Sequence, residues 1–150
     1  MLIRRQQLYV RETNESFGYN EKTQTPHSVW GVAKKILGDE IEIQENLYAF
    51  YYDCGMKLIG FAHISKGDIS STIIAKRVIF KYAIDLLASS IIIVHNHPTG
   101  TLKASIEDTI VMNELREGAK ILDIRLLDSL IISKNGFYSM TSEEVEVVNV

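Results

Sequence analysis

Cysteine is almost absent from this chain: among 150 residues it occurs once, at Cys54. A single thiol excludes an internal disulfide and the clusters of thiolates that hold many structural zinc ions. The chain therefore suits a reducing cytoplasm, and any zinc must be held by histidine and carboxylate side chains. Cys54 falls in an expected turn, where we interpret it as a structural or incidental thiol.

Long apolar runs and basic runs are also missing. The most apolar stretch, residues 86–94, is interrupted by two serines and is too short to span a bilayer. No apolar segment follows the arginines near the amino terminus, so no signal peptide is expected. The formal net charge is −3 and no basic cluster stands out, which argues against a large phosphate-binding surface. We expect a soluble, cytoplasmic protein that does not bind membranes.

The composition is that of a globular protein, with 46% apolar and 23% charged residues. Apolar residues at helical spacing predict helices at 26–37, 75–88 and 105–119, the last with Ile110, Val111, Leu115 and Ala119 facing inward. Strands are predicted at 7–12, 45–52, 57–65, 91–94 and 137–140, with one or two more within 121–133. We expect residues 13–25 to form an exposed arm and residues 143–150 to be loose.

Strands that alternate with helices predict a three-layer α/β domain, in which helices flank a mixed β-sheet. We expect residues 1–150 to form one domain, with a strand and arm in residues 1–25 and the core in residues 26–141. The run at 91–94 is wholly apolar and β-branched, which is typical of a central strand buried on both faces.

Two histidines follow this apolar run directly. In an extended segment, residues two apart point to the same side, so His95 and His97 can reach one cation. Asp108, arriving from the next helix, would complete three protein ligands and leave one position for water, as in catalytic zinc sites. The histidines also lie between a buried strand and a helix, where open α/β sheets place ligands.

Simpler interpretations exist for each of these residues. The two histidines, taken alone, are compatible with turn or surface positions. Ser105 followed by Asp108 at the head of a helix resembles a capping box. The capping box and the metal site are compatible, because a capped first turn is rigid and can hold Asp108 toward the end of the preceding strand.

Several motifs together carry a family resemblance. They are Gln44-Glu45, residues 67–72, residues 88–94, residues 95–100 and residues 126–128. A glutamate followed far downstream by His-x-His-Pro and Ser-x-x-Asp resembles the JAMM metalloprotease signature, and the surrounding sequence resembles its bacterial RadC-like branch. The resemblance extends from Glu45 to about Ser139, and it implies a JAB/MPN fold of the cytidine-deaminase-like kind.

The resemblance also implies a role for each matching residue. His95, His97 and Asp108 match the ligands of a Zn²⁺ ion, and Ser105 matches a hydroxyl that stabilises the oxyanion. Glu45 matches the general acid/base, although Glu40 and Glu42 lie close by and a solvated glutamate at a strand edge is the simpler alternative. The implied activity is zinc-dependent hydrolysis of a peptide or isopeptide bond in a protein or peptide substrate.

The chain departs from the branch in two respects. The branch usually shows Asp-His after the late strand, whereas this chain has Asp128-Ser129, which puts in doubt the part that this histidine plays. Asp128 itself is either a residue that supports the site or a strand-end residue. Longer members carry an N-terminal helix-hairpin-helix-like region, and we expect none in this chain.

Three alternative functions have weaker support in the sequence. A non-catalytic MPN interaction module would use the same fold, although such modules tend to lose their metal ligands. A DNA-processing metalloenzyme agrees with the family's DNA-repair label, but nucleic acid enters through that label alone because no basic patch accompanies it. A zinc nucleobase deaminase lacks support because its His-x-Glu and Pro-Cys-x-x-Cys signatures are missing. No sequence feature points to a particular oligomeric state.

Overall fold

The apolar run at 91–94 lies within a buried strand, β3 (Ser90–Asn96). The computed structural model describes residues 25–67 and 72–148, and in it β3 belongs to a mixed six-stranded sheet with the order β2-β1-β3-β4-β5-β6. The other strands are β1 (Asn46–Tyr52), β2 (Leu58–Lys66), β4 (Arg125–Ser133), β5 (Gly136–Ser139) and β6 (Glu144–Val147). The predicted strand at 7–12 and all but the last residue of the predicted arm at 13–25 lie outside the described residues.

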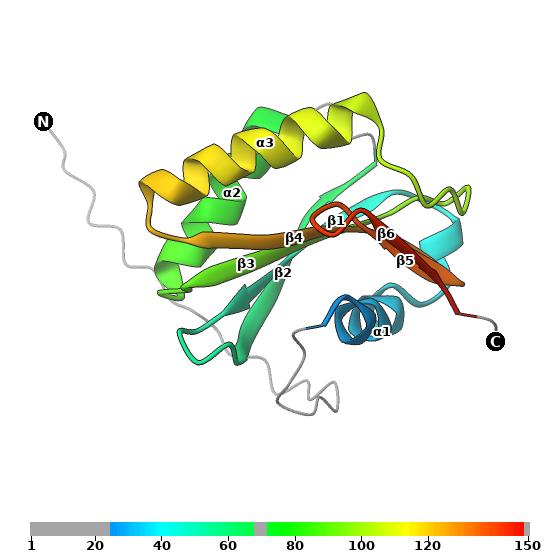
Figure 1. Cartoon of the computed structure of the whole chain (residues 1–150), viewed down its shortest axis with the longest axis horizontal. Coiled ribbons are helices and arrows are strands. Elements are labelled where there is room, and N and C mark those ends of the chain that lie inside the picture. Colours follow the sequence, from blue (N-terminus) through cyan, green and yellow to red (C-terminus); the bar gives the residue numbers. More distant parts are fainter. Residues whose placement is uncertain (1–24, 68–71, 149–150) are drawn as a thin grey trace, which may run out of the picture.

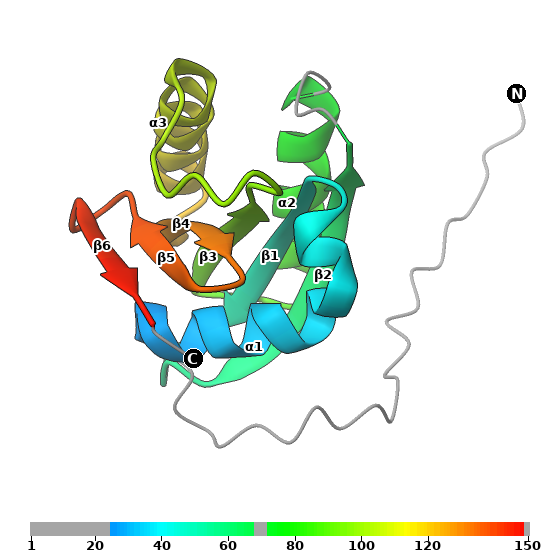
Figure 2. The same cartoon turned by 90° about the vertical axis from the view of Figure 1, so that its right-hand side faces the viewer.

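Helices cover both faces of the sheet, as Figures 1 and 2 show. Helices α2 (Thr72–Asp85) and α3 (Ile106–Ile121) lie on one face, and α1 (Pro26–Leu37) lies on the other. Helix α3 joins β3 to β4, which is the parallel pair of the sheet, while the remaining neighbours are antiparallel. This arrangement confirms the predicted three-layer α/β architecture with a mixed sheet.

Alternation along the strands divides the core into two layers. On β3, Ile92 and Val94 pack on the side of α1, whereas Ile91 and Ile93 pack on the side of α2 and α3. The side chain of each residue in β3 is therefore buried whichever way it points, which explains the uninterrupted apolar run. The same alternation decides on which face His95 and its neighbours lie.

Helix starts follow local hydrogen bonding. Thr25 caps α1 through a reciprocal capping box with Ser28, and Pro26 occupies the first turn, where its missing N–H costs nothing. A 3-10 helix, η1 (Gly38–Glu42), follows α1 and leads toward Glu45. No helix among the described residues combines the length and the apolarity needed to cross a membrane.

Three expectations about the elements need correction. The segment after residue 143 is not loose: β6 pairs with β5, and Gly136 permits this because a Cβ there would collide with the Glu146 carbonyl oxygen. Ile110 does not face inward but is 53% exposed, and Met112 is buried on that helix. The second helix spans residues 72–85 rather than 75–88. By contrast, the single strand at residues 125–133 agrees with the one or two strands expected within 121–133.

Candidate metal centre

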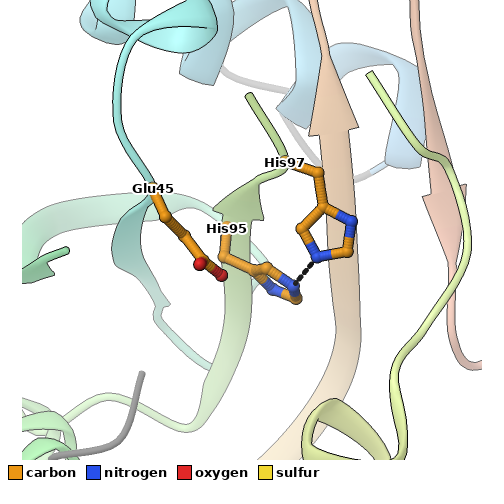
Figure 3. Close-up of side chains that lie close together, drawn as sticks. All are labelled: Glu45, His95 and His97. Atoms are coloured by element: carbon orange, nitrogen blue, oxygen red, sulfur yellow. Dashed lines mark hydrogen bonds between the residues drawn. The ribbon is translucent and has the colours of Figure 1, made fainter. Parts of the chain in front are cut away.

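The carboxyl end of β3 presents the two histidines side by side. His95 is the next-to-last residue of the strand and points to the face covered by α2 and α3, where only 3% of it is exposed. His97 follows the strand, and its Nε2 atom lies 3.2 Å from Nε2 of His95 (Figure 3). The spacing of two residues therefore brings both imidazoles to one point, as predicted.

A tight turn fixes the orientation of His97. The carbonyl of His97 accepts from the N–H of Gly100 at 2.9 Å, and Gly100 adopts a φ of +79° that a residue with a Cβ rarely adopts. The turn carries the Thr101 carbonyl back to Nδ1 of His97 at 2.8 Å. Because a carbonyl only accepts, Nδ1 bears the hydrogen and the lone pair of Nε2 is directed into the site.

Asp108 reaches the histidines from the first turn of α3. Its carboxylate oxygens lie 3.1 Å from Nε2 of His95 and 3.7 Å from Nε2 of His97. Burial raises the pKa of this carboxyl group, but hydrogen bonds from His95 and Ser105 outweigh burial and hold the pKa well below its usual range. Asp108 is therefore a carboxylate anion over the whole range of neutral pH.

Ser105 is the N-cap of α3 and the partner of Asp108. Its Oγ accepts from the Asp108 N–H at 3.0 Å and donates to Asp108 Oδ2 at 2.7 Å, while its own N–H donates to the same oxygen at 2.8 Å. The capping box predicted from the sequence is confirmed. It also turns the Asp108 carboxylate toward β3, so the cap and the site share the same bonds.

Glu45 joins this group from the segment that leads into β1, the antiparallel neighbour of β3. Strand β1 pairs antiparallel with β3, with Leu47 opposite His95, and continuing this register places Glu45 opposite His97. Glu45, His95 and His97 each offer one atom, and these atoms all lie within 4.8 Å of one another (Figure 3). The nearby Glu40 and Glu42 instead pair with Lys66 and Lys134. The structure thus brings together all five residues singled out in the sequence.

The spacing of these atoms suits a small tetrahedral cation. Bonds of about 2.0–2.2 Å to nitrogen and oxygen give ligand atoms that are about 3.3–3.5 Å apart in a tetrahedron. The two Nε2 atoms are 3.2 Å apart, and Asp108 approaches them with different oxygens: Oδ1 lies 3.1 Å from Nε2 of His95 and Oδ2 lies 3.7 Å from Nε2 of His97. In the structure hydrogen bonds join these groups, and a cation would take the place of the protons that they share. The donor set therefore fits a divalent metal ion.

The two carboxylates are not equivalent. Asp108 is buried and is joined to Ser105 by three hydrogen bonds, two of which hold its carboxylate. Glu45 is half-buried and follows a 3-10 turn rather than a helix cap. Asp108 is thus the more firmly held carboxylate, whereas Glu45 is the one that forms a candidate metal-binding group with the two histidines.

Residues 128 and 129 both lie on β4, but they have different surroundings. Ser129 is buried and lines a small, mostly apolar cavity with His95 and Asp108 between the sheet and helices α2 and α3. Asp128 instead accepts from Ser139 Oγ at 2.6 Å and from the Thr141 N–H at 3.1 Å. Asp128 therefore ties the end of β5 to β4, which favours the strand-end interpretation.

The comparison with known proteins agrees with this geometry. A family model described as the RadC-like JAB domain matches residues 23–145. The chain belongs to the RadC-like JAB domain family. Among the relatives of this RadC-like JAB domain, a UPF0758 protein of Clostridium perfringens is 35% identical over 140 residues, which are 92% of this chain and 62% of that protein. A UPF0758 protein of Finegoldia magna is 37% identical over 133 residues, 89% of this chain and 57% of that protein.

A third relative covers less of the fold. A UPF0758 protein of Flavobacterium johnsoniae is 34% identical over 101 residues, which are 67% of this chain and 44% of that protein. The RadC-like JAB domain described here thus spans between 44% and 62% of the length of these three relatives. The resemblance inferred from the motifs is confirmed at the level of the family.

Proposed function

We propose that this domain is a zinc-dependent hydrolase that cleaves a peptide or isopeptide bond in a protein substrate. The observation that carries the proposal is the close approach of two imidazole nitrogens and a buried, hydrogen-bonded carboxylate, with a second carboxylate beside them. Three protein ligands leave one position for solvent, which is the arrangement of catalytic rather than structural zinc sites. Membership of a family that includes hydrolases supports the same conclusion.

His95, His97 and Asp108 would hold the ion. When bound, zinc would supply Lewis acidity, which lowers the pKa of a coordinated water from that of bulk water to about 7 and polarises the carbonyl of the substrate. Zinc rather than magnesium or calcium is favoured because imidazole nitrogens make up two of the three ligands. The buried Asp108 contributes the negative charge that holds a dication at this position.

Glu45 would move the proton. Its carboxylate lies beside the two histidines (Figure 3), where it would be within reach of a water bound at the site. We propose that it takes the proton of that water and returns it to the leaving amine, which is the usual division of work for a general base that becomes a general acid. A half-buried glutamate suits this part because solvent and substrate can both approach it.

Ser105 has a second part in the proposal. In the structure its hydroxyl donates to Asp108, so a hydrogen bond to the developing oxyanion requires the hydroxyl to rotate away. One oxyanion donor is worth about 3 kcal/mol of transition-state stabilisation. In this proposal the hydroxyl orients Asp108 in the resting protein and would turn to donate to the carbonyl oxygen during the reaction.

The test uses Glu45→Gln, which removes the base but keeps the size and hydrogen-bonding ability of the side chain. We expect the zinc-loaded variant to retain its zinc, measured by elemental analysis, and to lose hydrolysis of fluorogenic peptide and ε-linked isopeptide libraries. Full activity of Glu45→Gln would contradict the assignment of the base. Zinc bound by the wild type without turnover of either library would favour a non-catalytic interaction module.

A further inference from the structure

We propose that Asn96, the residue between the two histidines, is a positioning residue that fixes the segment of Glu45 against β3. This inference rests on the proposed function only for the reason why the position of Glu45 matters. The placement of the Glu45 segment against β3 is itself supported by hydrogen bonds within the protein.

Asn96 points away from the histidines. Because successive residues of a strand alternate, the side chain of Asn96 lies on the face covered by α1 and η1, while that of His95 lies on the face of α2 and α3. Asn96 is fully buried, so each of its polar groups needs a partner within the protein. Among the described residues, the partners of its side chain lie in residues 41–46, which lead into β1 and include its first residue.

The amide of Asn96 holds this segment on both sides of Glu45. Its Oδ1 accepts from the Asn46 N–H at 2.8 Å, and its Nδ2 donates to the carbonyls of Ile41 and Gln44, each at 2.9 Å. Gln44 and Asn46 are the immediate neighbours of Glu45 in the chain. A buried amide thus fixes the peptide groups before and after the glutamate.

Further contacts complete the frame around Glu45. The Glu45 carbonyl accepts from the Gly67 N–H at 2.8 Å, and the Asn46 side chain donates to the Gln44 carbonyl at 2.9 Å. The ion pairs that Glu40 and Glu42 make with lysines are about half exposed, and exposed pairs contribute little. The buried Asn96 amide is therefore the main connection between this segment and β3.

Only an amide of this length meets the requirements of the position. The pocket presents two carbonyl acceptors and one N–H donor, which match the two hydrogens and the oxygen of an asparagine side chain. Aspartate would set an oxygen against two carbonyls, and an apolar residue would remove all three hydrogen bonds, leaving the Gln44 carbonyl with the Asn46 side chain alone. The strand that supplies His95 thus also sets the distance between Glu45 and the histidines.

The experiment compares wild type, Asn96→Ala and Asn96→Asp with Tyr51→Phe. Tyr51→Phe is the matched control because it removes a buried hydrogen bond from β1, to the Ile79 carbonyl, without touching the Glu45 segment. Asn96→Asp preserves the volume and the acceptor for the Asn46 N–H, so it provides the measurement where the alanine variant does not fold.

The first measurement is amide hydrogen exchange in the metal-free protein, corrected for global stability. We expect the Gly67 N–H to exchange about tenfold faster in both Asn96 variants, because local opening then breaks fewer buried hydrogen bonds. In Asn96→Ala the Asn46 N–H should exchange about tenfold faster as well. Tyr51→Phe leaves both rates unchanged. Unchanged rates in the Asn96 variants would overturn the inference.

The second measurement uses Co²⁺ as the probe. In the wild-type background, we expect Glu45→Ala to change the visible absorption spectrum of bound Co²⁺, because the carboxylate lies beside the ion's ligands. In the Asn96→Ala background the same substitution should change it much less, whereas in the Tyr51→Phe background it keeps its full effect. An equal effect of Glu45→Ala in all backgrounds would overturn the inference. If the wild type binds no Co²⁺, the hydrolase proposal fails, and amide exchange alone decides the role of Asn96.

Discussion

The hydroxyl of Ser105 provides the sharpest link between stability and metal binding. It accepts from the Asp108 N–H and donates to Asp108 Oδ2, so Ser105→Ala removes a helix cap and a hydrogen bond to a proposed ligand at once. Loss of an N-cap costs about 1 kcal/mol, which for a chain of this size lowers Tm by about 2–4 °C. The Ser105 N–H still donates to Asp108, so the carboxylate is loosened rather than released.

The expected effect on zinc is larger than the effect on folding suggests. Loss of a residue that orients a ligand usually weakens metal binding 10–100-fold, and since one bond to Asp108 remains, we expect about tenfold for Ser105→Ala. The assay is zinc affinity by competition with a chromophoric chelator, beside thermal unfolding of the metal-free protein. Ser105→Thr, which keeps the hydroxyl, should bind zinc like the wild type.

The chain offers a matched control at the start of α1. Thr25 forms a capping box with Ser28 of the same kind as that of Ser105 with Asp108, but it does not contact the site. Thr25→Ala should therefore lower Tm by a similar amount and leave zinc affinity unchanged. If Ser105→Ala and Thr25→Ala are alike in both measurements, the cap of α3 is structural only and the reasoning about Asp108 is refuted.

Two further predictions concern buried polar groups. Tyr51 OH donates to the Ile79 carbonyl, whereas Tyr52 OH is buried without a hydrogen-bond partner among the described residues. In denaturant titrations, Tyr51→Phe should therefore destabilise the protein by about 1 kcal/mol, and Tyr52→Phe should stabilise it by a similar amount. Destabilisation by both substitutions would contradict this. Burial raises the pKa of Asp108, but hydrogen bonds from its neighbours lower this pKa by more than burial raises it. The carboxylate therefore contributes stability above the unfolded pKa of about 3.9, and this contribution is lost as pH falls through the folded pKa. The free energy of unfolding of the metal-free wild type should therefore exceed that of Asp108→Asn by a constant amount above about pH 5 and by less below about pH 4; a difference that does not change with pH would contradict it.

Much of the site was predictable because it depends on local periodicity. Residues two apart in a strand share a face whatever the rest of the fold, so the convergence of His95 and His97 follows from their spacing. The Ser105–Asp108 box is equally local, since both partners lie within one helical turn. Glu45 needed more: the register of β1 against β3 puts it at the site, and its position in the sequence was found through the family motif.

What the sequence did not reveal depends on contacts between distant segments. Asn96 bonds to residues 41–46, about fifty positions away, although one signal was available: a polar residue on the alternate face of an apolar strand must have buried partners. The strand β6 is short and its residues are exposed, so its pairing with β5 depends on the absence of a Cβ at Gly136. Ile110 follows the helical spacing of the apolar residues, yet no described residue packs over it closely enough to bury it.

Zinc stoichiometry tests the central claim most directly. The wild type and His97→Ala would each be stripped with chelator, reloaded with an excess of Zn²⁺, freed of unbound metal by gel filtration and measured by elemental analysis. The account predicts one zinc per wild-type chain and a large loss in His97→Ala, since His97 supplies one of the three converging atoms. A wild type that retains no zinc, or a His97→Ala variant that retains as much as the wild type, would contradict it.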